Sequence, residues 1–411
     1  MSLEFNRREL LVTGTVASMA LPGASFAQNA PAAPAAPAEP VAPVAAAPSD
    51  TSGVPNNEKK LNIVTLRDLE AEAQKVMAAF GFAYAAGGAG DEWTLRENLA
   101  AFNRWVINPE YMNGTGAADT TTTLLGSKIS YPVITAPIGN QGSVHAKADE
   151  PNVKGTNAAG TIFCASSVSQ LSLEEIAAAG EGPKWFQLYI PRDRGFAKEL
   201  LQRAKAAGYK AIIVTADVDV TSNRERSMRL QGAAVPNLKM GNAPKTPGGK
   251  GSAMDMKGDM AWSDVEFCRQ ESGLPVIIKS ILSPSQALQG LKYGCSAIWL
   301  SNHGGRQLDN SPSAMTTLPQ VAKAVKGRVP IIIDGGIFRG QDVFRALALG
   351  AAAVAIGRPT LYGSALGGAQ GVQAVHSHLK AELGMVMRLA GTPAIKNITR
   401  EFVARAERES A

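Results

Sequence analysis

From about residue 129 onward, short apolar runs alternate with longer stretches that have helical periodicity. The apolar runs are rich in β-branched residues and nearly continuous, which is typical of parallel strands buried on both faces. Eight such runs occupy residues 131–138, 161–167, 184–190, 211–218, 275–281, 296–302, 329–336 and 351–357. Three of the helical patterns between them end at Gly208, Gly294 and Gly350, as helices commonly do.

This alternation predicts an α/β fold, a (β/α)8 barrel. A doubly wound open sheet usually has fewer strands, and no G-x-G-x-x-G motif follows the first strand. Ahead of the barrel, residues 65–77 predict an amphipathic helix that caps its bottom or side, and residues 83–102 lead into a second helix. Residues 229–261 follow the fourth strand with little periodicity, which predicts a lid or a disordered insertion on the active face.

The first 57 residues are predicted to lie outside the barrel. Arg7 and Arg8 precede a short apolar run that ends in small residues, so residues 1–27 predict a twin-arginine export signal that delivers the folded protein to the periplasm. The apolar run is too short to span a membrane. Residues 28–57 are rich in Ala and Pro and predict a disordered linker, which leaves residues 58–411 as the catalytic domain.

Composition and spacing argue against nucleic-acid and metal sites. The formal net charge is +6, and no basic block is interleaved with aromatic residues, as a nucleic-acid groove would require. The three cysteines are widely spaced, and Cys164 and Cys295 are predicted to be buried small hydrophobes. His376 and His378 are two apart on a predicted helix and cannot share a metal. His145, in the first loop, is expected to be an orienting or surface residue.

Polar residues gather at the predicted C-terminal ends of the strands, where barrels of this kind build their active sites. They are Gln187, Tyr189, Thr215, Asp217, Arg224, Lys279, His303, Arg306, Asp334, Gly357 and Arg358. Burying such groups unpaired costs about 1–3 kcal/mol each, so we expect a ligand to cover this face. "DGGIFRG" and "AIGRP" end the last two strands, and their glycines and arginines predict a phosphate-bearing cofactor.

The segment "SNHGGRQLD", residues 301–309, follows the sixth strand and holds the histidine best placed for chemistry. Two glycines leave space around His303, and Asp217 could hold one ring nitrogen and raise its basicity. The sequence therefore predicts that His303 is a general base. Asp309 is expected to be a structural partner of the loop.

The same segment resembles the signature of the FMN-dependent α-hydroxy-acid oxidases and dehydrogenases. Seven further segments resemble blocks of that family in order: "FAYAAGGAGDEWTLREN", "TAPIGNQG", "WFQLYI", "TADVDVTSNRER", "LPVIIKSI", "DGGIFRG" and "IGRP". The resemblance covers about residues 61–390 and is strongest to the lactate oxidases. It implies FMN as the cofactor and a homotetrameric assembly.

The resemblance also implies a role for each matching residue. His303 would take the substrate's proton, Asp217 would pair with it, and Tyr189 would bond the substrate hydroxyl. Lys279 would lie beside the N1–O2 edge of the flavin, where its charge stabilises the reduced ring. The substrate carboxylate would be held by Tyr84, Arg224 and Arg306. The other cofactor contacts would be Pro137, Ile138, Gly139, Ser166, Gln187, Thr215, Ser301, Asp334, Gly335, Gly336, Arg339, Gly357 and Arg358.

The expected activity is FMN-dependent oxidation of a small L-2-hydroxy acid, L-lactate foremost, to the 2-oxo acid, with oxygen as acceptor and hydrogen peroxide as product. The alternative is a periplasmic dehydrogenase of a lactate-like or mandelate-like acid that passes electrons to a quinone or cytochrome. Gly139 stands where an alanine is common in the oxidases, and the missing methyl is expected to admit a larger substrate side chain or to alter oxygen access. No aromatic residue follows at the expected place after "RSMRLQGAAVPNLK", which predicts a more open pocket than that of lactate oxidase.

Other classes of protein fit the sequence less well. An IMP-dehydrogenase-like barrel would need a catalytic cysteine in a loop, and none of the three cysteines is placed for it. A non-catalytic flavin-binding protein would be expected to have a broken site, whereas His303, Asp217 and both arginines are present.

Overall fold

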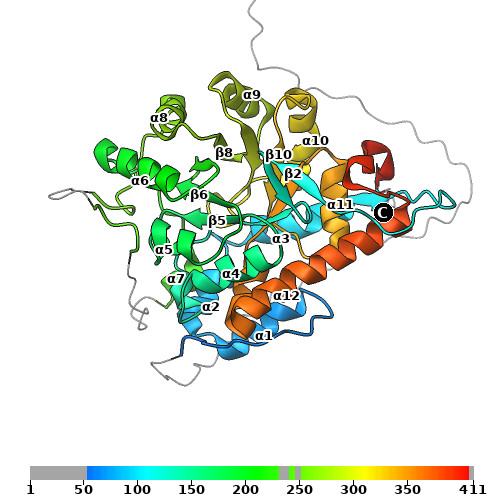
Figure 1. Cartoon of the computed structure of the whole chain (residues 1–411), viewed down its shortest axis with the longest axis horizontal. Coiled ribbons are helices and arrows are strands. Elements are labelled where there is room, and N and C mark those ends of the chain that lie inside the picture. Colours follow the sequence, from blue (N-terminus) through cyan, green and yellow to red (C-terminus); the bar gives the residue numbers. More distant parts are fainter. Residues whose placement is uncertain (1–52, 231–239, 246–250, 407–411) are drawn as a thin grey trace, which may run out of the picture. The chain divides into compact units, whose positions relative to one another are not determined.

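The eight predicted strands form a closed parallel barrel (Figure 1), which confirms the predicted fold class. The computed structural model describes residues 53–230, 240–245 and 251–406; the predicted signal, most of the predicted linker and parts of the 229–261 loop lie outside these ranges. The barrel strands are β4 (Val133–Thr135), β5 (Phe163–Ser166), β6 (Lys184–Leu188), β7 (Ile212–Thr215), β8 (Val276–Ile281), β9 (Ala297–Leu300), β10 (Ile331–Asp334) and β11 (Ala353–Ile356). Pairing of β11 with β4 closes the barrel.

Helices between consecutive strands form the outer layer. They are α4 (Glu150–Ala158), α5 (Leu173–Ala178), α6 (Arg194–Ala206), α7 (Glu225–Met228), α8 (Trp262–Ser272), α9 (Pro284–Lys292), α10 (Ala314–Val325) and α11 (Gly340–Ala348), and α12 (Arg358–Ala390) follows the last strand. The glycines predicted to end three of these patterns, Gly208, Gly294 and Gly350, all have positive φ.

Three more helices precede the barrel: α1 (Asp68–Val76), α2 (Ala79–Ala86) and α3 (Trp93–Ala100). The first confirms the predicted helix and lies along α12 (Figure 1), where the Tyr362 hydroxyl donates to Glu70 Oε2 at 3.1 Å. Short elements complete the fold: β1 (Trp105–Ile107) with β12 (Val403–Arg405), β2 (Thr122–Leu124) with β3 (Ser127–Ile129), and the 3-10 turns η1 (Ala101–Arg104), η2 (Gln141–Ser143), η3 (Ile395–Asn397) and η4 (Arg400–Phe402).

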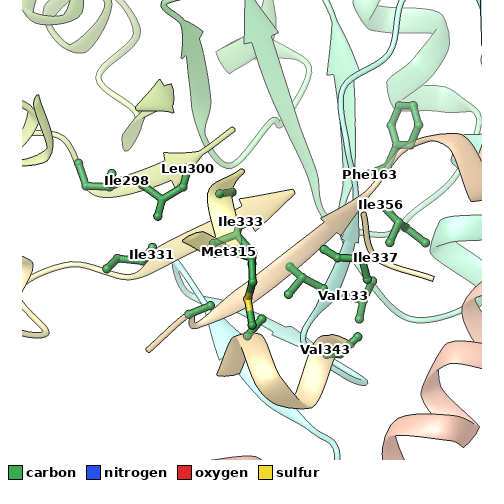
Figure 2. Close-up of a cluster of buried hydrophobic side chains, with 14 of the residues drawn as sticks. Val133, Phe163, Ile298, Leu300, Met315, Ile331, Ile333, Ile337, Val343 and Ile356 are labelled. Carbon is green, nitrogen blue, oxygen red and sulfur yellow. The ribbon is translucent and has the colours of Figure 1, made fainter. Parts of the chain in front are cut away.

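Alternate residues of each barrel strand face two different cores. In β10, Ile332 belongs to the core inside the barrel, while Ile331 and Ile333 pack in the layer between strands and helices. Figure 2 shows this outer layer, with Met315 of α10 and Val343 of α11 beside them. Burying a side chain of this size contributes about 1.5–3 kcal/mol, which explains why both faces of the strands are apolar.

The folded unit begins earlier than the predicted boundary at residue 58. The Pro55 carbonyl accepts a hydrogen bond from the Ala146 amide at 2.8 Å, and the Asn57 side chain donates to the Ala365 carbonyl at 3.0 Å. The last residues of the Ala/Pro-rich stretch therefore belong to the barrel, because their polar groups are paired with it.

The remaining histidines and the cysteines have structural surroundings. His145 is buried, and its Nε2 lies 3.1 Å from the Asn57 carbonyl oxygen, so it orients the chain rather than facing solvent. His376 contacts the Tyr131 hydroxyl at 2.6 Å, and burial lowers the pKa of His376 to about 3. His378 instead lies 3.3 Å from Glu382, which confirms that the two face different neighbours. Cys164 and Cys295 are buried as predicted.

Within the part of the chain that the structure describes, no helix is both long and apolar enough to cross a membrane. Nor do the described residues contain a group of three or more His, Cys, Asp or Glu side chains that could hold a metal ion.

Asp309 joins the loop after β9 to the start of α3. Its carboxylate accepts the backbone N–H of Trp93 at 3.3 Å and of Thr94 at 2.8 Å. These are amides of the first turn of α3, which have no partner within the helix. Asp309 is thus a structural partner of the loop, as predicted, and it caps a helix more than two hundred residues earlier in the chain.

Replacing this cap should destabilise the fold. Asp309→Ala is expected to lower the free energy of unfolding by about 1 kcal/mol, because two first-turn amides lose their acceptor. Asp309→Asn keeps one side-chain oxygen acceptor and should lose less. Urea unfolding of the FMN-loaded protein measures both, and an unchanged midpoint for Asp309→Ala would contradict the capping role.

Candidate active site

A cavity of about 550 Å³ opens at the C-terminal ends of the barrel strands, a size typical of ligand sites. Most of the residues predicted for the site line it. They are Tyr84, Pro137, Ile138, Gly139, Tyr189, Arg224, Lys279, His303, Arg306, Asp334, Gly335, Gly336, Gly357 and Arg358. Five more predicted residues lie at or just after the same strand ends without lining the cavity: Ser166, Gln187, Thr215, Asp217 and Ser301. Arg339 does not line the cavity either.

His303 and Asp217 form the predicted pair. His303 Nδ1 lies 3.1 Å from Asp217 Oδ1, and the other ring nitrogen lies 3.4 Å from the Tyr189 hydroxyl. Because the carboxylate accepts the Nδ1 proton, Nε2 is left as the basic nitrogen toward the cavity. Burial raises the pKa of Tyr189, so its hydroxyl remains a donor at neutral pH.

The Asp217 carboxylate raises the pKa of His303, as predicted, but burial lowers this pKa and outweighs the carboxylate. For Asp217, burial would raise the pKa, but the His303 ring and the Lys279 ammonium outweigh it and lower the pKa to about 2. The pair therefore consists of a neutral imidazole and an ionised carboxylate near pH 7.

The backbone at His303 is held in an unfavourable conformation. Its φ is +59°, in the left-handed region that non-glycine residues seldom adopt. The His303 amide donates to Ser301 Oγ at 3.0 Å, and Arg358 Nη1 donates to the Gly304 carbonyl at 2.9 Å. These two bonds fix the loop on both sides of the imidazole.

Two guanidinium groups lie beside this pair. Arg224 donates to the Arg306 carbonyl at 3.1 Å and to Gln307 Oε1 at 2.7 Å. Arg306 donates to the carbonyls of Tyr84 and Gly87 and lies 4.7 Å from the centre of the Tyr84 ring. Burial lowers the pKa of Arg306 to about 10, which leaves it cationic at neutral pH.

Gln307 is a site residue that the sequence analysis quoted without giving it a role. Its amide nitrogen donates to the carbonyls of Asp217 and Val220, while its oxygen accepts from Arg224. One side chain thus ties the loop after β7 to the loop after β9. The sequence offered one signal for this role, because Gln307 directly follows Arg306 in the segment "SNHGGRQLD".

Lys279 lies in a buried polar cluster at the strand ends. Its ammonium donates to Ser301 Oγ at 3.1 Å and lies 3.8 Å from Asp334 Oδ2. The Asp334 carboxylate also accepts from Ser301 Oγ at 2.7 Å and from the Trp299 ring nitrogen at 3.0 Å. Asp334 is thus a partner of Lys279, and it also lines the cavity, where it was predicted to contact the cofactor.

The strand ends also carry buried polar atoms that match a flavin ring. Gln187 Nε2 and Thr215 Oγ1 are buried without a hydrogen-bond partner among the described residues. Ser166 Oγ donates to Gln187 Oε1 at 3.0 Å, which fixes the orientation of the amide. The amide nitrogen of Gln187 is then the atom without a partner. An unpaired buried polar atom costs about 1–3 kcal/mol, and the polar edge of a bound flavin would supply the missing partners.

Of the glycines that directly follow β10 and β11, Gly357 leaves room for a phosphate group. A Cβ added at Gly357 would meet only Ile138 Cδ1, at 3.7 Å, so the fold itself does not require glycine there. Gly335 and Gly336 have φ of +90° and +81°, and a Cβ at Gly336 would clash with the Asn98 carbonyl. Arg358 is the first residue of α12, and a helix N-terminus favours an anion. The residues present therefore fit FMN.

Arg339, which was predicted to contact the phosphate, is not among the residues that line the cavity. Its Nη1 is 2.9 Å from Glu382 Oε1 on α12, and the neighbouring Phe338 lines the cavity instead. The first amides of α11 are also occupied, because those of Phe338 and Arg339 donate to Asp342 and that of Gly340 donates to Glu382. A phosphate would therefore rely on Arg358 and the N-terminus of α12.

Fold and cavity together define a barrel enzyme with a site for an anionic cofactor and a base beside it. The chain belongs to the family of the FMN-dependent dehydrogenases, whose model matches residues 73–405. It is 43% identical to the L-lactate oxidase of Lentilactobacillus hilgardii over 350 residues, which are 83% of this chain and 94% of that protein. It is 36% identical to the glycolate oxidase of Spinacia oleracea, over 84% of this chain and 96% of that protein.

Solved structures agree with this membership. The crystal structure of a mandelate oxidase with (S)-2-phenylpropionate matches with a TM-score of 0.78 and 33% identity, over 84% of this chain and 99% of that one. This protein is therefore an FMN-dependent enzyme that oxidises 2-hydroxy acids.

The placement of Arg339 and Phe338 predicts their effect on cofactor affinity. Arg339→Gln should leave the Kd for FMN within about twofold, because Glu382 holds that guanidinium away from the cavity. Phe338→Arg should tighten binding by roughly tenfold, about 1.4 kcal/mol, since a charge-assisted contact to a phosphate contributes on this scale. Flavin fluorescence on titration of the apoprotein measures both. Weakening by tenfold or more in Arg339→Gln would show that Arg339 contacts the cofactor.

Proposed function

We propose that the chain oxidises small L-2-hydroxy acids, L-lactate among them, to 2-oxo acids, with oxygen as the acceptor and hydrogen peroxide as the product. The observation that carries this proposal is the His303 imidazole, which is held by Asp217 through Nδ1 and lines the same cavity as two guanidinium groups. Relatives named L-lactate oxidase, at 43% and 41% identity, support lactate and oxygen.

The substrate carboxylate has matching partners in the cavity. Arg224 and Arg306 offer paired donors to its two oxygens, and Tyr84 lies against Arg306. The Tyr84 hydroxyl donates to the Gly139 carbonyl at 3.1 Å, which fixes the ring between the carboxylate site and the loop after β4. Anchoring one end of the acid in this way leaves its hydroxyl near His303 and Tyr189.

His303 then removes a proton while Asp217 stabilises the imidazolium that forms. The Tyr189 hydroxyl, 3.4 Å from Nε2, hydrogen-bonds the substrate oxygen from the other side. When bound, FMN supplies the two-electron acceptor that this chain's side chains lack. Lys279 places a buried positive charge at the strand ends, where it favours extra negative charge on the ring.

A dehydrogenase that passes electrons to a quinone or cytochrome is the second candidate, and the residue that bears on it is Gly139, which stands where an alanine is common in the oxidases. An added Cβ there would clash with Val168 Cγ2, so glycine lets the loops after β4 and β5 pack closely against each other. Turnover of L-lactate under air distinguishes the two candidates. Peroxide formed in step with pyruvate supports the oxidase, whereas product formation that needs a quinone or dye supports the dehydrogenase.

We propose that residues 1–27 export the folded, FMN-loaded protein to the periplasm, and that it assembles as a tetramer. Arg7 and Arg8 in a short apolar leader support the export. Replacing both arginines with lysine should leave the protein in the cytoplasm in a fractionation experiment. Light scattering of the purified protein measures the assembly, and a monomer would refute the tetramer.

The pH dependence of kcat/KM tests the base. Because only the neutral imidazole accepts a proton, activity should rise with pH through the His303 pKa, which burial places below its ordinary value of about 6.5. Asp217→Asn removes the carboxylate that raises this pKa, so the rise should move to still lower pH. His303→Gln should slow flavin reduction by roughly 10²- to 10⁴-fold. A rise centred above 6.5 would contradict the assignment.

Gly139→Ala tests the space beside the flavin. The new methyl must displace Val168, and overpacking of this kind costs about 1–3 kcal/mol, so kcat/KM for L-mandelate should fall at least fivefold more than for L-lactate. The variant is compared with the parent on both substrates, under air and with a dye acceptor. Unchanged ratios in all four assays would remove Gly139 as a determinant of substrate or acceptor.

A further inference from the structure

Three methionines form part of the cavity wall: Met240, Met254 and Met256, here called the methionine wall. All three belong to the long connection between β7 and α8. Met240 directly follows "RSMRLQGAAVPNLK", the stretch after which an aromatic residue was expected. The described parts of this connection therefore present unbranched thioether side chains to the cavity.

Backbone contacts fix where the methionine wall lies. The Gly241 amide donates to the Ser169 carbonyl at 3.1 Å, which places Met240 beside the loop after β5. The Lys257 amide donates to the Ile190 carbonyl at 2.8 Å, and Met256 forms a bridge with Pro191. Met256 thus adjoins the chain directly after Tyr189.

These positions differ from those of the carboxylate-binding groups. Arg224 and Arg306 are held by Gln307 and by the Gly87 carbonyl, on the loops after β7, β9 and α2. An acid that places its carboxylate on the arginines and its hydroxyl between His303 and Tyr189 has one substituent left to accommodate. The methionine wall is what the remaining cavity offers that substituent.

We propose that the methionine wall binds the substrate side chain, and that the enzyme prefers L-2-hydroxy acids with unbranched aliphatic side chains longer than the methyl of L-lactate. Methionine is flexible and polarisable, so it adapts to apolar groups of varied length. This inference rests on the proposed oxidation of 2-hydroxy acids in the same cavity and identifies the class of substrate.

The proposal predicts a dependence on chain length. Each methylene buried against the methionine wall should raise kcat/KM by roughly fourfold, the equivalent of about 0.8 kcal/mol. The series L-lactate, L-2-hydroxybutanoate, L-2-hydroxypentanoate and L-2-hydroxyhexanoate measures this. Flavin reduction is followed anaerobically in the FMN-loaded protein, so the nature of the electron acceptor does not affect the result.

Single serine substitutions test the methionines. Met240→Ser and Met254→Ser should reduce the gain in kcat/KM per methylene to about twofold or less. Met385→Ser is the matched control, because Met385 is 49% exposed on α12, away from the cavity, and Met254 is 57% exposed. Flavin content and the midpoint of thermal unfolding show that each variant is folded.

The outcomes separate this inference from the proposed function. The methionine wall is supported if kcat/KM rises with chain length in the parent and in the control, and if both wall variants flatten this rise. The inference is overturned if kcat/KM falls for acids longer than L-lactate, or if both wall variants retain the rise with chain length. Neither result contradicts the oxidation of 2-hydroxy acids. If no acid in the series reduces the flavin, the proposed function itself fails.

Discussion

The site depends on how one short segment is held after β9. His303 has a φ of +59°, a conformation that persists only where surrounding contacts over-determine it. Asp217 holds the ring, Ser301 holds the amide, and Arg358 holds the next carbonyl. These contacts come from β7, β9 and α12, so the base is oriented by the closed barrel rather than by its own loop.

The same contacts bring several positive charges to one cavity. Arg224, Arg306, Arg358 and Lys279 line it, and Asp334 is the acidic side chain among the described lining residues. Burial of like charges is unfavourable unless anions offset it. A phosphate-bearing cofactor and a carboxylate substrate are such anions, so the electrostatics of the cavity match a 2-hydroxy acid beside FMN. Burial lowers the pKa of His303, and the positive charges of Lys279 and Arg224 lower it further.

The sequence predicts the parts of this arrangement that follow from strand ends. Near-continuous apolar runs located the eight barrel strands, and the polar residues ending them included His303, Asp217 and Lys279. It assigned Arg339 to the cofactor, whereas Phe338 lines the cavity, because neighbouring residues at the start of a helix point in different directions and only packing shows which one faces the site. The role of Gln307 and the net pKa of His303 depend on contacts between distant loops, which no local pattern encodes. The boundary near Pro55 was missed for the same reason, since its partner is Ala146.

The most direct test of the central claim is anaerobic mixing of the purified protein with L-lactate while the visible flavin band is recorded. The account predicts a yellow protein whose band is bleached by L-lactate, and a His303→Gln variant that stays yellow but is bleached at least a hundredfold more slowly. A colourless protein, or a flavin band that L-lactate and its longer homologues leave unchanged, would contradict it.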